Sequence, residues 1–231
     1  MDEAVSQRAE SRSRRRRLIP EVIVIASLVI LPSIVANIQA VVDPEPRRSV
    51  LRSLSSASGL PTTIEFLGII GAVLFVVSMT GDLPMLGLRF RPRVDLWLVI
   101  GLFAVWYVCA SHQGWLKYAR PKSEIGLVVL ILGLVGVAIS AISEELVFRC
   151  HLISRLTELL GNRWAAWGIS SVLFGACHLY ESWTSAGIIL IEGAVVGLVF
   201  LLTKRSVTGM IVHATTNGLL FCLSCGYLRA H

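Results

Sequence analysis

The segment AISEELVFRCHL, residues 141–152, places two adjacent acids and an arginine directly after residues 126–143, which carry no charge. A charged side chain near the middle of a bilayer costs about 2.5–3.5 kcal/mol, so these acids are expected to face a partner or a watery cavity. Glu145 and Arg149 stand at i and i+4 with the acid first, the better order for a helical ion pair. Glu144 is rotated about 100 degrees from Glu145. Two such carboxylates should not both ionise easily, which suits general acid and base chemistry.

Two further apolar segments carry polar side chains at helical spacing. FGACHLY places Phe174 and His178 at i and i+4, and HATTN does the same for His213 and Asn217. An imidazole and an amide side by side can donate hydrogen bonds to a developing oxyanion. Each pattern alone also fits a packed histidine or a polar contact between membrane helices. Three successive apolar segments with base, acid or oxyanion groups together favour a catalytic site.

Composition identifies the kind of protein that must position these residues. The chain has 231 residues, is 55% hydrophobic and 16% charged, and has a mean hydropathy of +0.73, so we expect an integral membrane protein. The net charge is +6, but much of it lies in arginines that precede the first apolar segment, where they set topology. Nucleic acid is not an expected partner, because no basic face interleaved with aromatic residues follows.

The hydropathy pattern predicts an all-α fold, a polytopic membrane helical bundle with about seven transmembrane helices, since a span needs about 20 apolar residues. Residues 1–17 are expected to form a basic cytoplasmic N-terminal tail. Residues 18–231 would form a single membrane domain with a catalytic core at about 125–224. The expected helices are 18–42, 59–80, 94–111, 125–147, 164–180, 184–203 and 207–224.

The first apolar segment is interpreted as a retained anchor. It begins after a basic run, as a signal peptide does, but is longer than the usual 7–15 apolar residues and lacks a clean cleavage site. Pro20 and Pro32 are compatible with this, because membrane helices tolerate proline. The distribution of lysine and arginine favours a cytoplasmic N-terminus and an outer C-terminus, although the outer loops are themselves basic. We expect a multi-pass protein of the cell (plasma) membrane.

The remaining polar and sulfur-containing residues give weaker signals. Glu192 has no partner within its own segment and is expected either to line the same cavity or to lie near an interface. His112 and His151 stand at segment edges, where a solvated role is expected. All the cysteines lie in or beside apolar segments, so no disulfide framework is indicated. Cys222 and Cys225 have CxxC spacing, but a zinc site of this kind needs a second pair.

In order along the chain, the three motifs resemble those of the CAAX-processing and bacteriocin-processing (CPBP, or Abi) family of intramembrane proteases. The pattern is EExxxR, then FxxxH, then HxxxN, and it covers about residues 125–224. The resemblance implies the architecture of a type II CAAX prenyl endopeptidase, a helical bundle with a conical, water-accessible cavity. The family commonly has glycine after the motif arginine, where this chain has Cys150; both are small, so close helix packing should survive.

The resemblance also implies roles for the motif residues. Glu144 and His178 would activate a water, and His213 and Asn217 would hold the oxyanion. Glu145 and Arg149 would support the site, with Phe174 as a further supporting residue. The implied substrate is a protein or peptide, prenylated or not, that associates with the lipid bilayer.

Three alternatives stay open at this point. In the first, His178, His213 and a glutamate bind a catalytic zinc, although the chain has no HExxH sequence; metal-free catalysis without a cofactor is the preferred prediction. In the second, the acids and histidines form the proton relay of a membrane transporter. Inverted repeats with matching broken helices would support transport, and the sequence shows none. In the third, the chain is a non-proteolytic immunity factor.

Overall fold

The computed structural model describes residues 2–42, 59–112 and 126–224. Within these ranges all regular structure is helical, which confirms the predicted all-α fold. The basic loops expected on the outer side, and Cys225 of the CxxC pair, lie outside the described residues.

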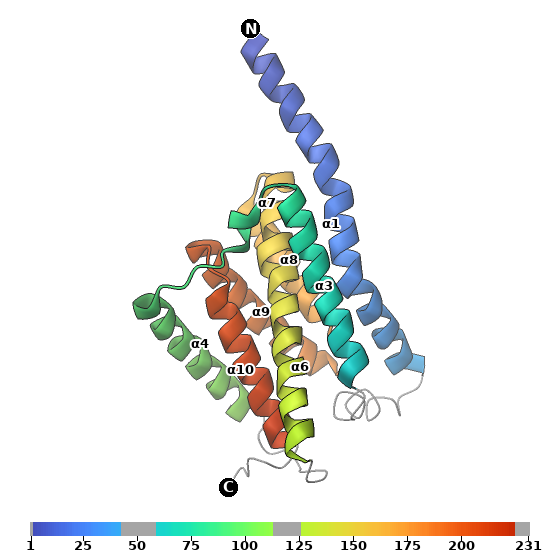
Figure 1. The fold of residues 1–231 in the computed structure, drawn as a ribbon, viewed down its shortest axis with the longest axis vertical. Coiled ribbons are helices and arrows are strands. Elements are labelled where there is room, and N and C mark those ends of the chain that lie inside the picture. The colour runs from blue at the N-terminus through green and yellow to red at the C-terminus, as the bar shows by residue number, and fades with distance from the viewer. Residues whose placement is uncertain (1, 43–58, 113–125, 225–231) are drawn as a thin grey trace.

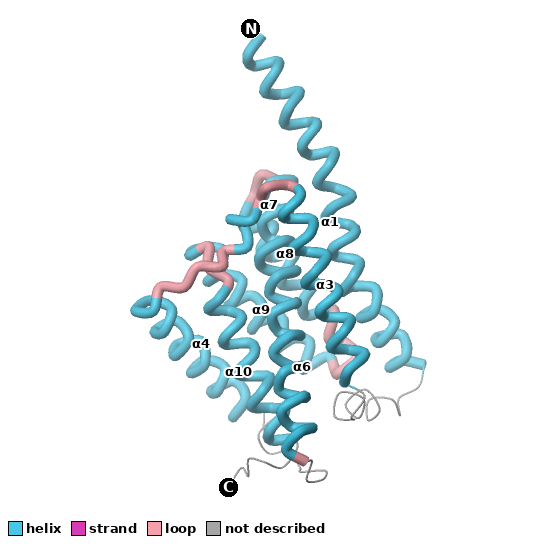
Figure 2. The backbone as a smooth tube through the Cα atoms, in the orientation of Figure 1, coloured by secondary structure: helices cyan, strands magenta, loops and turns pink. Residues whose placement is uncertain are grey.

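The described helices form a bundle (Figures 1 and 2). α6 packs against α3 and α10, and α8 packs against α9. The elements in chain order are α1 (Asp2–Val42), α3 (Gly59–Met79), the 3-10 helix η1 (Leu83–Leu86), α4 (Pro92–His112), α6 (Leu127–Glu145), the π-helix η2 (Leu146–Ile153), α7 (Ser154–Leu160), α8 (Arg163–Ala176), α9 (Trp183–Thr203) and α10 (Val207–Ser224).

The expected number of about seven helices is confirmed for the described residues when α6, η2 and α7 are counted as one continuous helix. In the described part of the chain, three helical stretches are long and apolar enough to cross a membrane, and two apolar stretches are shorter. The long ones are Ser13–Ile38, Leu127–Leu160 and Trp183–Thr203, and the shorter ones are Thr63–Met79 and Val207–Leu223. α1 begins at Asp2, so the stretch expected as a basic tail continues the first membrane helix beyond the bundle (Figure 1).

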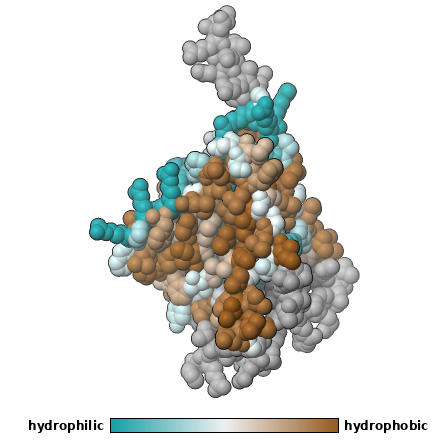
Figure 3. Space-filling model, in the orientation of Figure 1, coloured by the Kyte–Doolittle hydropathy of each residue, from teal (hydrophilic) through white to brown (hydrophobic). Residues whose placement is uncertain are grey.

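The outer surface of the bundle is apolar, as a lipid-facing surface must be. Figure 3 shows hydrophobic residues over most of the coloured surface, with hydrophilic residues gathered near the upper end and at the left edge. Many large apolar side chains point outward; Phe75 is 65% exposed, Trp97 73% and Leu132 65%. In water such a surface would mark an aggregation or interaction site, whereas in a bilayer it contacts lipid.

The helix that carries the EExxxR motif is longer than predicted. The expected end at residue 147 is wrong, because the chain continues as helix to Leu160, where Gly161 adopts a left-handed φ of 68°. All eight residues of the π-helix η2 are buried. The charges of this segment find partners inside the bundle, as expected for charged groups placed deep in a membrane protein. Wide π-turns within α-helices are frequent at functional sites.

The helix that carries the FxxxH motif is shorter than predicted. α8 starts after Asn162, whose side chain accepts hydrogen bonds from the backbone N–H groups of Trp164 and Ala165. It ends at Ala176, not near residue 180, so His178 lies in the turn that follows. The helical placement of His178 was therefore wrong, although the turn still keeps its ring beside Phe174, with centroids 5.1 Å apart.

His151 is not solvated, contrary to the prediction from its place at a segment edge. It is fully buried, with Nε2 3.0 Å from Oε1 of Glu21 on α1. Nε of Arg155 lies 2.6 Å from the same oxygen, and its Nη1 lies 2.7 Å from Oδ2 of Asp82. The partners come from distant segments, so periodicity within one helix could not show them. This network joins α1, the α3–η1 turn, η2 and α7 at one end of the bundle.

A second buried cluster fixes the start of α10. Asp95 of α4 is fully buried; its Oδ1 accepts a hydrogen bond from Thr208 at 2.7 Å and lies 2.9 Å from Nη1 of Arg205. The carbonyl oxygen of Leu86 accepts from Ser206 Oγ at 2.6 Å and from Cys150 Sγ at 3.1 Å. These contacts connect α4, η1 and η2 to the first turn of α10, which carries His213 further along.

Candidate active site

The side chains of the three motifs come from neighbouring elements and meet inside the bundle. Glu144 and Glu145 end α6, and Arg149 follows in η2. Phe174 lies on α8, and His213 lies on α10, which packs directly against α6. Positions far apart in the sequence therefore form one cluster.

His213 lies between the two adjacent glutamates. Its Nδ1 is 3.1 Å from Oε1 of Glu145, and its Nε2 is 3.7 Å from Oε2 of Glu144. A carboxylate only accepts hydrogen bonds, so Nδ1 donates to Glu145 and Nε2 faces Glu144. Glu144 is also held by Ser140, whose hydroxyl donates to Oε1 at 2.9 Å. Because Glu144 and Glu145 point in different directions from the helix, as predicted, one carboxylate lies near each ring nitrogen of His213.

The predicted ion pair between Glu145 and Arg149 is present. Nε of Arg149 lies 3.4 Å from Oε2 of Glu145, and the two side chains are 3% and 1% exposed. The guanidinium also stacks on Phe174, with Cζ 4.1 Å from the ring centroid. Such stacking suits the planar, weakly hydrated guanidinium. Arg149 is therefore bound on one side by charge and on the other by an aromatic face.

The Phe174 ring connects the two histidines. It packs edge-on against His213, with centroids 5.9 Å apart and planes at 86°, and against His178 at 61°. Nδ1 of His178 donates to the backbone carbonyl of Phe174 at 2.9 Å. In the neutral ring this leaves Nε2 of His178 as a hydrogen-bond acceptor, the form that a general base requires.

Asn217 stands one turn beyond His213 on α10 and is half-buried. Four residues correspond to about 6 Å along a helix axis. The structure thus brings Glu144, Glu145, Arg149, Phe174, His178 and His213 into one contact network, with Asn217 further along α10.

Two glycines let the surrounding helices approach this network. A Cβ on Gly193 of α9 would lie 2.6 Å from Cδ1 of Phe174 and 3.3 Å from Nη2 of Arg149. A Cβ on Gly209 of α10 would lie 2.9 Å from Oε2 of Glu145. Real Cβ atoms essentially never come closer than 3.0 Å, so the site depends on these small residues.

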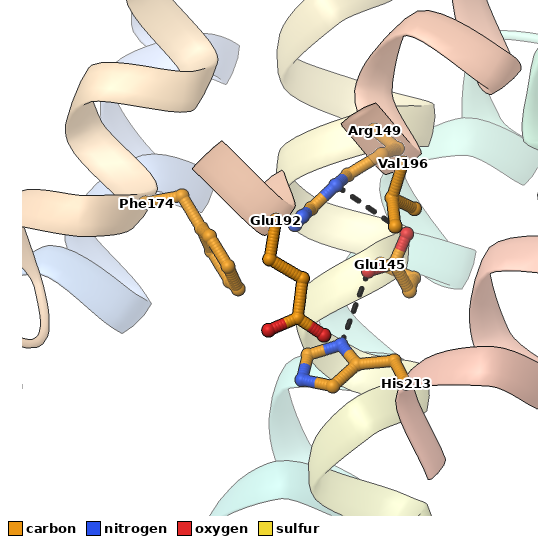
Figure 4. A pocket seen from close by; sticks show the side chains of 6 residues that line it. All are labelled: Glu145, Arg149, Phe174, Glu192, Val196 and His213. Carbon is orange, nitrogen blue, oxygen red and sulfur yellow. Dashed lines mark hydrogen bonds and ion pairs between the residues drawn. The ribbon is translucent and has the colours of Figure 1, made fainter. Parts of the chain in front are cut away.

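A small cavity lies at the centre of the network, with room for about one water molecule. Figure 4 shows its lining, made by Glu145, Arg149, Phe174, Glu192, Val196 and His213. Glu192 is the site residue that motif spacing did not assign. Of the two places expected for it, the structure supports the cavity. Its partners lie on other helices, so its own segment offered no sign of them.

No group of three or more His, Cys, Asp or Glu side chains with metal-binding geometry is found among the described residues. Metal-free catalysis remains a prediction.

Comparison with known proteins gave one match. Residues 126–219 match the family model described as "Type II CAAX prenyl endopeptidase Rce1-like". No curated protein and no solved structure matches the chain. The matched segment contains every motif residue named above, from Glu144 to Asn217. The family resemblance predicted from the three motifs is therefore confirmed over residues 126–219.

Proposed function

We propose that this protein is an intramembrane endopeptidase that hydrolyses a peptide bond of a membrane-associated protein or peptide. The observation that carries the proposal is the position of His213, whose two ring nitrogens face Glu145 and Glu144 at 3.1 and 3.7 Å. A neutral structural histidine is satisfied by one acceptor and one donor, whereas both ring nitrogens of His213 face acceptors. Two carboxylates on one imidazole, in a bundle with an apolar exterior, are typical of groups arranged for proton transfer.

In the proposed reaction, Glu144 and His178 activate a water for attack on the substrate carbonyl carbon. Glu144 takes a proton from the water as the oxygen–carbon bond forms, and later gives a proton to the leaving nitrogen as the carbon–nitrogen bond breaks. General-base catalysis by a positioned side chain contributes about 10² to 10⁴-fold. Ser140, which donates to Oε1 of Glu144, leaves Oε2 as the oxygen on the side of the histidine.

The oxyanion of the tetrahedral intermediate would be stabilised from α10. His213 donates from Nε2 in its imidazolium form, because Nδ1 is occupied by Glu145. Asn217 donates from its amide when substrate approaches along α10. A donor aimed at an oxyanion is worth about 10² to 10³-fold in rate.

Glu145 and Arg149 keep this arrangement in place. Glu145 orients His213 through Nδ1, and Arg149 neutralises Glu145 while packing on Phe174. None of these steps needs a bound metal or cofactor. We further propose that the protein lies in the plasma membrane with its N-terminus in the cytoplasm, because the arginines at positions 14–17 stand at the N-terminal end of the first long apolar stretch, Ser13–Ile38.

The test is a comparison of protein termini, by mass spectrometry, in membranes of cells that express the wild-type protein or Glu144→Gln. We expect new N-termini, adjacent to membrane-associated segments, that appear with the wild type alone. The mass of the released fragment shows whether the substrate is prenylated. Identical termini in both samples, together with proton-coupled solute uptake by the wild type, would replace the protease with the transporter.

A further inference from the structure

Glu192 is an acid of the active site that lies outside the three motifs. It projects from α9 into the same cavity as Arg149, Phe174 and His213, and Figure 4 shows its carboxylate beside the imidazole. The described protein gives it no hydrogen bond and no ion pair. A carboxylate in such a place is costly unless a partner binds it.

Each group around the cavity that can carry a positive charge already has a carboxylate other than Glu192 beside it. Arg149 forms its ion pair with Glu145 through Nε, at 3.4 Å, and stacks on Phe174, while its Nη1 has no hydrogen-bond partner. Both nitrogens of His213 face other carboxylates, Nδ1 toward Glu145 and Nε2 toward Glu144. Three carboxylates therefore share one guanidinium and one imidazole, and Glu192 forms no ion pair of its own with a described residue.

A second observation indicates that the cavity takes a donor. The Glu145 side chain is 1% exposed, and its Oε2, which carries the ion pair, has no hydrogen-bond partner. A buried acceptor without a donor costs about 1–3 kcal/mol. The cavity thus presents this oxygen and the Glu192 carboxylate in one space with room for about one water molecule.

We propose that Glu192 forms a subsite for a primary ammonium group of the substrate, next to the bond that is cleaved. An ammonium group is about the size of a water molecule and has three donors, enough for Glu192 and for Oε2 of Glu145. A guanidinium is planar and larger, so the space selects lysine over arginine. The inference rests on the proposed function for the identity of the ligand as a substrate.

A primary ammonium group can come from a lysine side chain or from a free peptide N-terminus. N-acetylated peptides with lysine, arginine or norleucine near the cleaved bond test for a side chain. Norleucine peptides with a free N-terminus test for the terminal ammonium group. Full-length protein in detergent would be assayed as wild type, Glu192→Gln and the matched control Glu65→Gln. Glu65 lies exposed on α3, so the control makes the same chemical change away from the site.

We expect wild type and Glu65→Gln to cleave ammonium-bearing peptides with a kcat/KM about 10- to 100-fold above that for acetylated norleucine peptides, as for a charged hydrogen bond. The ratio should fall toward one in Glu192→Gln. If the wild type prefers the acetylated lysine peptide, the subsite binds a lysine side chain. If it prefers only peptides with a free N-terminus, the subsite binds the terminal ammonium group. The inference is overturned if the wild type cleaves ammonium-bearing and acetylated norleucine peptides equally well. It is also overturned if the preference survives in Glu192→Gln.

A binding measurement separates this inference from the proposed function. Butylammonium chloride should raise the thermal midpoint of the wild type and of Glu65→Gln but not that of Glu192→Gln, and butanol should have no such effect. A midpoint shift without cleavage of any peptide would preserve the subsite and reject the endopeptidase. Absence of the shift in the wild type would reject the subsite even if peptides are cleaved.

Discussion

Nδ1 of His213 lies 3.1 Å from Oε1 of Glu145, across the contact between α10 and α6. Glu145 therefore makes two interactions, because the same carboxylate that accepts from His213 also forms an ion pair with Arg149. Glu145 thereby links the charge of Arg149 to the orientation of the imidazole. A substitution of Arg149 or Glu145 should therefore change the orientation of the His213 ring, although neither residue is proposed to contact the substrate's reacting bond.

Loss of the Arg149 charge should lower both stability and activity. Arg149→Met keeps the length of the side chain but leaves Glu145 buried without its counter-charge, which costs about 3–5 kcal/mol. Thermal unfolding in detergent should show a clear decrease in the midpoint. Arg16→Met, at an exposed position on α1, is the matched control.

The double variant Glu145→Gln with Arg149→Met separates charge from packing. It removes both charges, so we expect stability to return toward that of the wild type, because neutral replacement of a buried pair is often tolerated. Activity should stay low, because His213 loses its charged partner. An unchanged midpoint in the single Arg149→Met variant would show that Glu145 does not depend on this charge.

Helix α9 offers a matched pair of glycine variants. In Gly193→Ala the new methyl group would lie 2.6 Å from Phe174, so the ring and the guanidinium stacked on it must shift. We expect a loss of activity of at least about tenfold, because a displacement of about 1 Å can cost far more. Gly187→Ala on the same helix meets nothing within 4 Å and should be neutral or slightly stabilising. Equal activity of the two variants would contradict the tight packing at Gly193.

Sequence spacing predicted the interactions that lie within one segment and missed those between segments. The Glu145–Arg149 pair follows from i and i+4 spacing. Phe174 and His178 are also close, as predicted, although His178 lies in the turn after α8 and not in the helix. The burial of His151 depends on Glu21, which is 130 residues away in the chain. No periodicity within the last part of the EExxxR helix could reveal such a partner.

The helix ends illustrate the same limit. Gly161 ends α7 in a left-handed conformation, and Asn162 caps the start of α8; residues of these types commonly occupy such positions. The end of α8 at Ala176 has no glycine or proline after it, and the π-helix of η2 has no sequence signature that distinguishes it from an α-helix. The role of Glu192 required knowledge of which helices surround it.

Removal of metal should leave activity unchanged. In the proposed reaction a carboxylate activates the water and Asn217 helps to bind the oxyanion; a side-chain amide is a good oxyanion donor and a poor zinc ligand. Purified protein dialysed against a strong chelator should keep its rate and contain substoichiometric metal by elemental analysis. Activity that disappears on chelation and returns with one equivalent of zinc would reassign His178 and His213 as ligands.

The most direct test of the central claim is the cleavage rate of purified Glu144→Gln in a defined assay. The swap is nearly isosteric and keeps the oxygen that accepts from Ser140, so the helical spectrum and detergent elution should match those of the wild type. Glu65→Gln serves as the control for handling and activity. If Glu144 is the general base, the rate should fall by about 10² to 10⁴-fold while Glu65→Gln keeps the wild-type rate. A Glu144→Gln protein that retains more than about half of the wild-type rate would contradict the assignment, since loss of a general base should cost at least about 10²-fold.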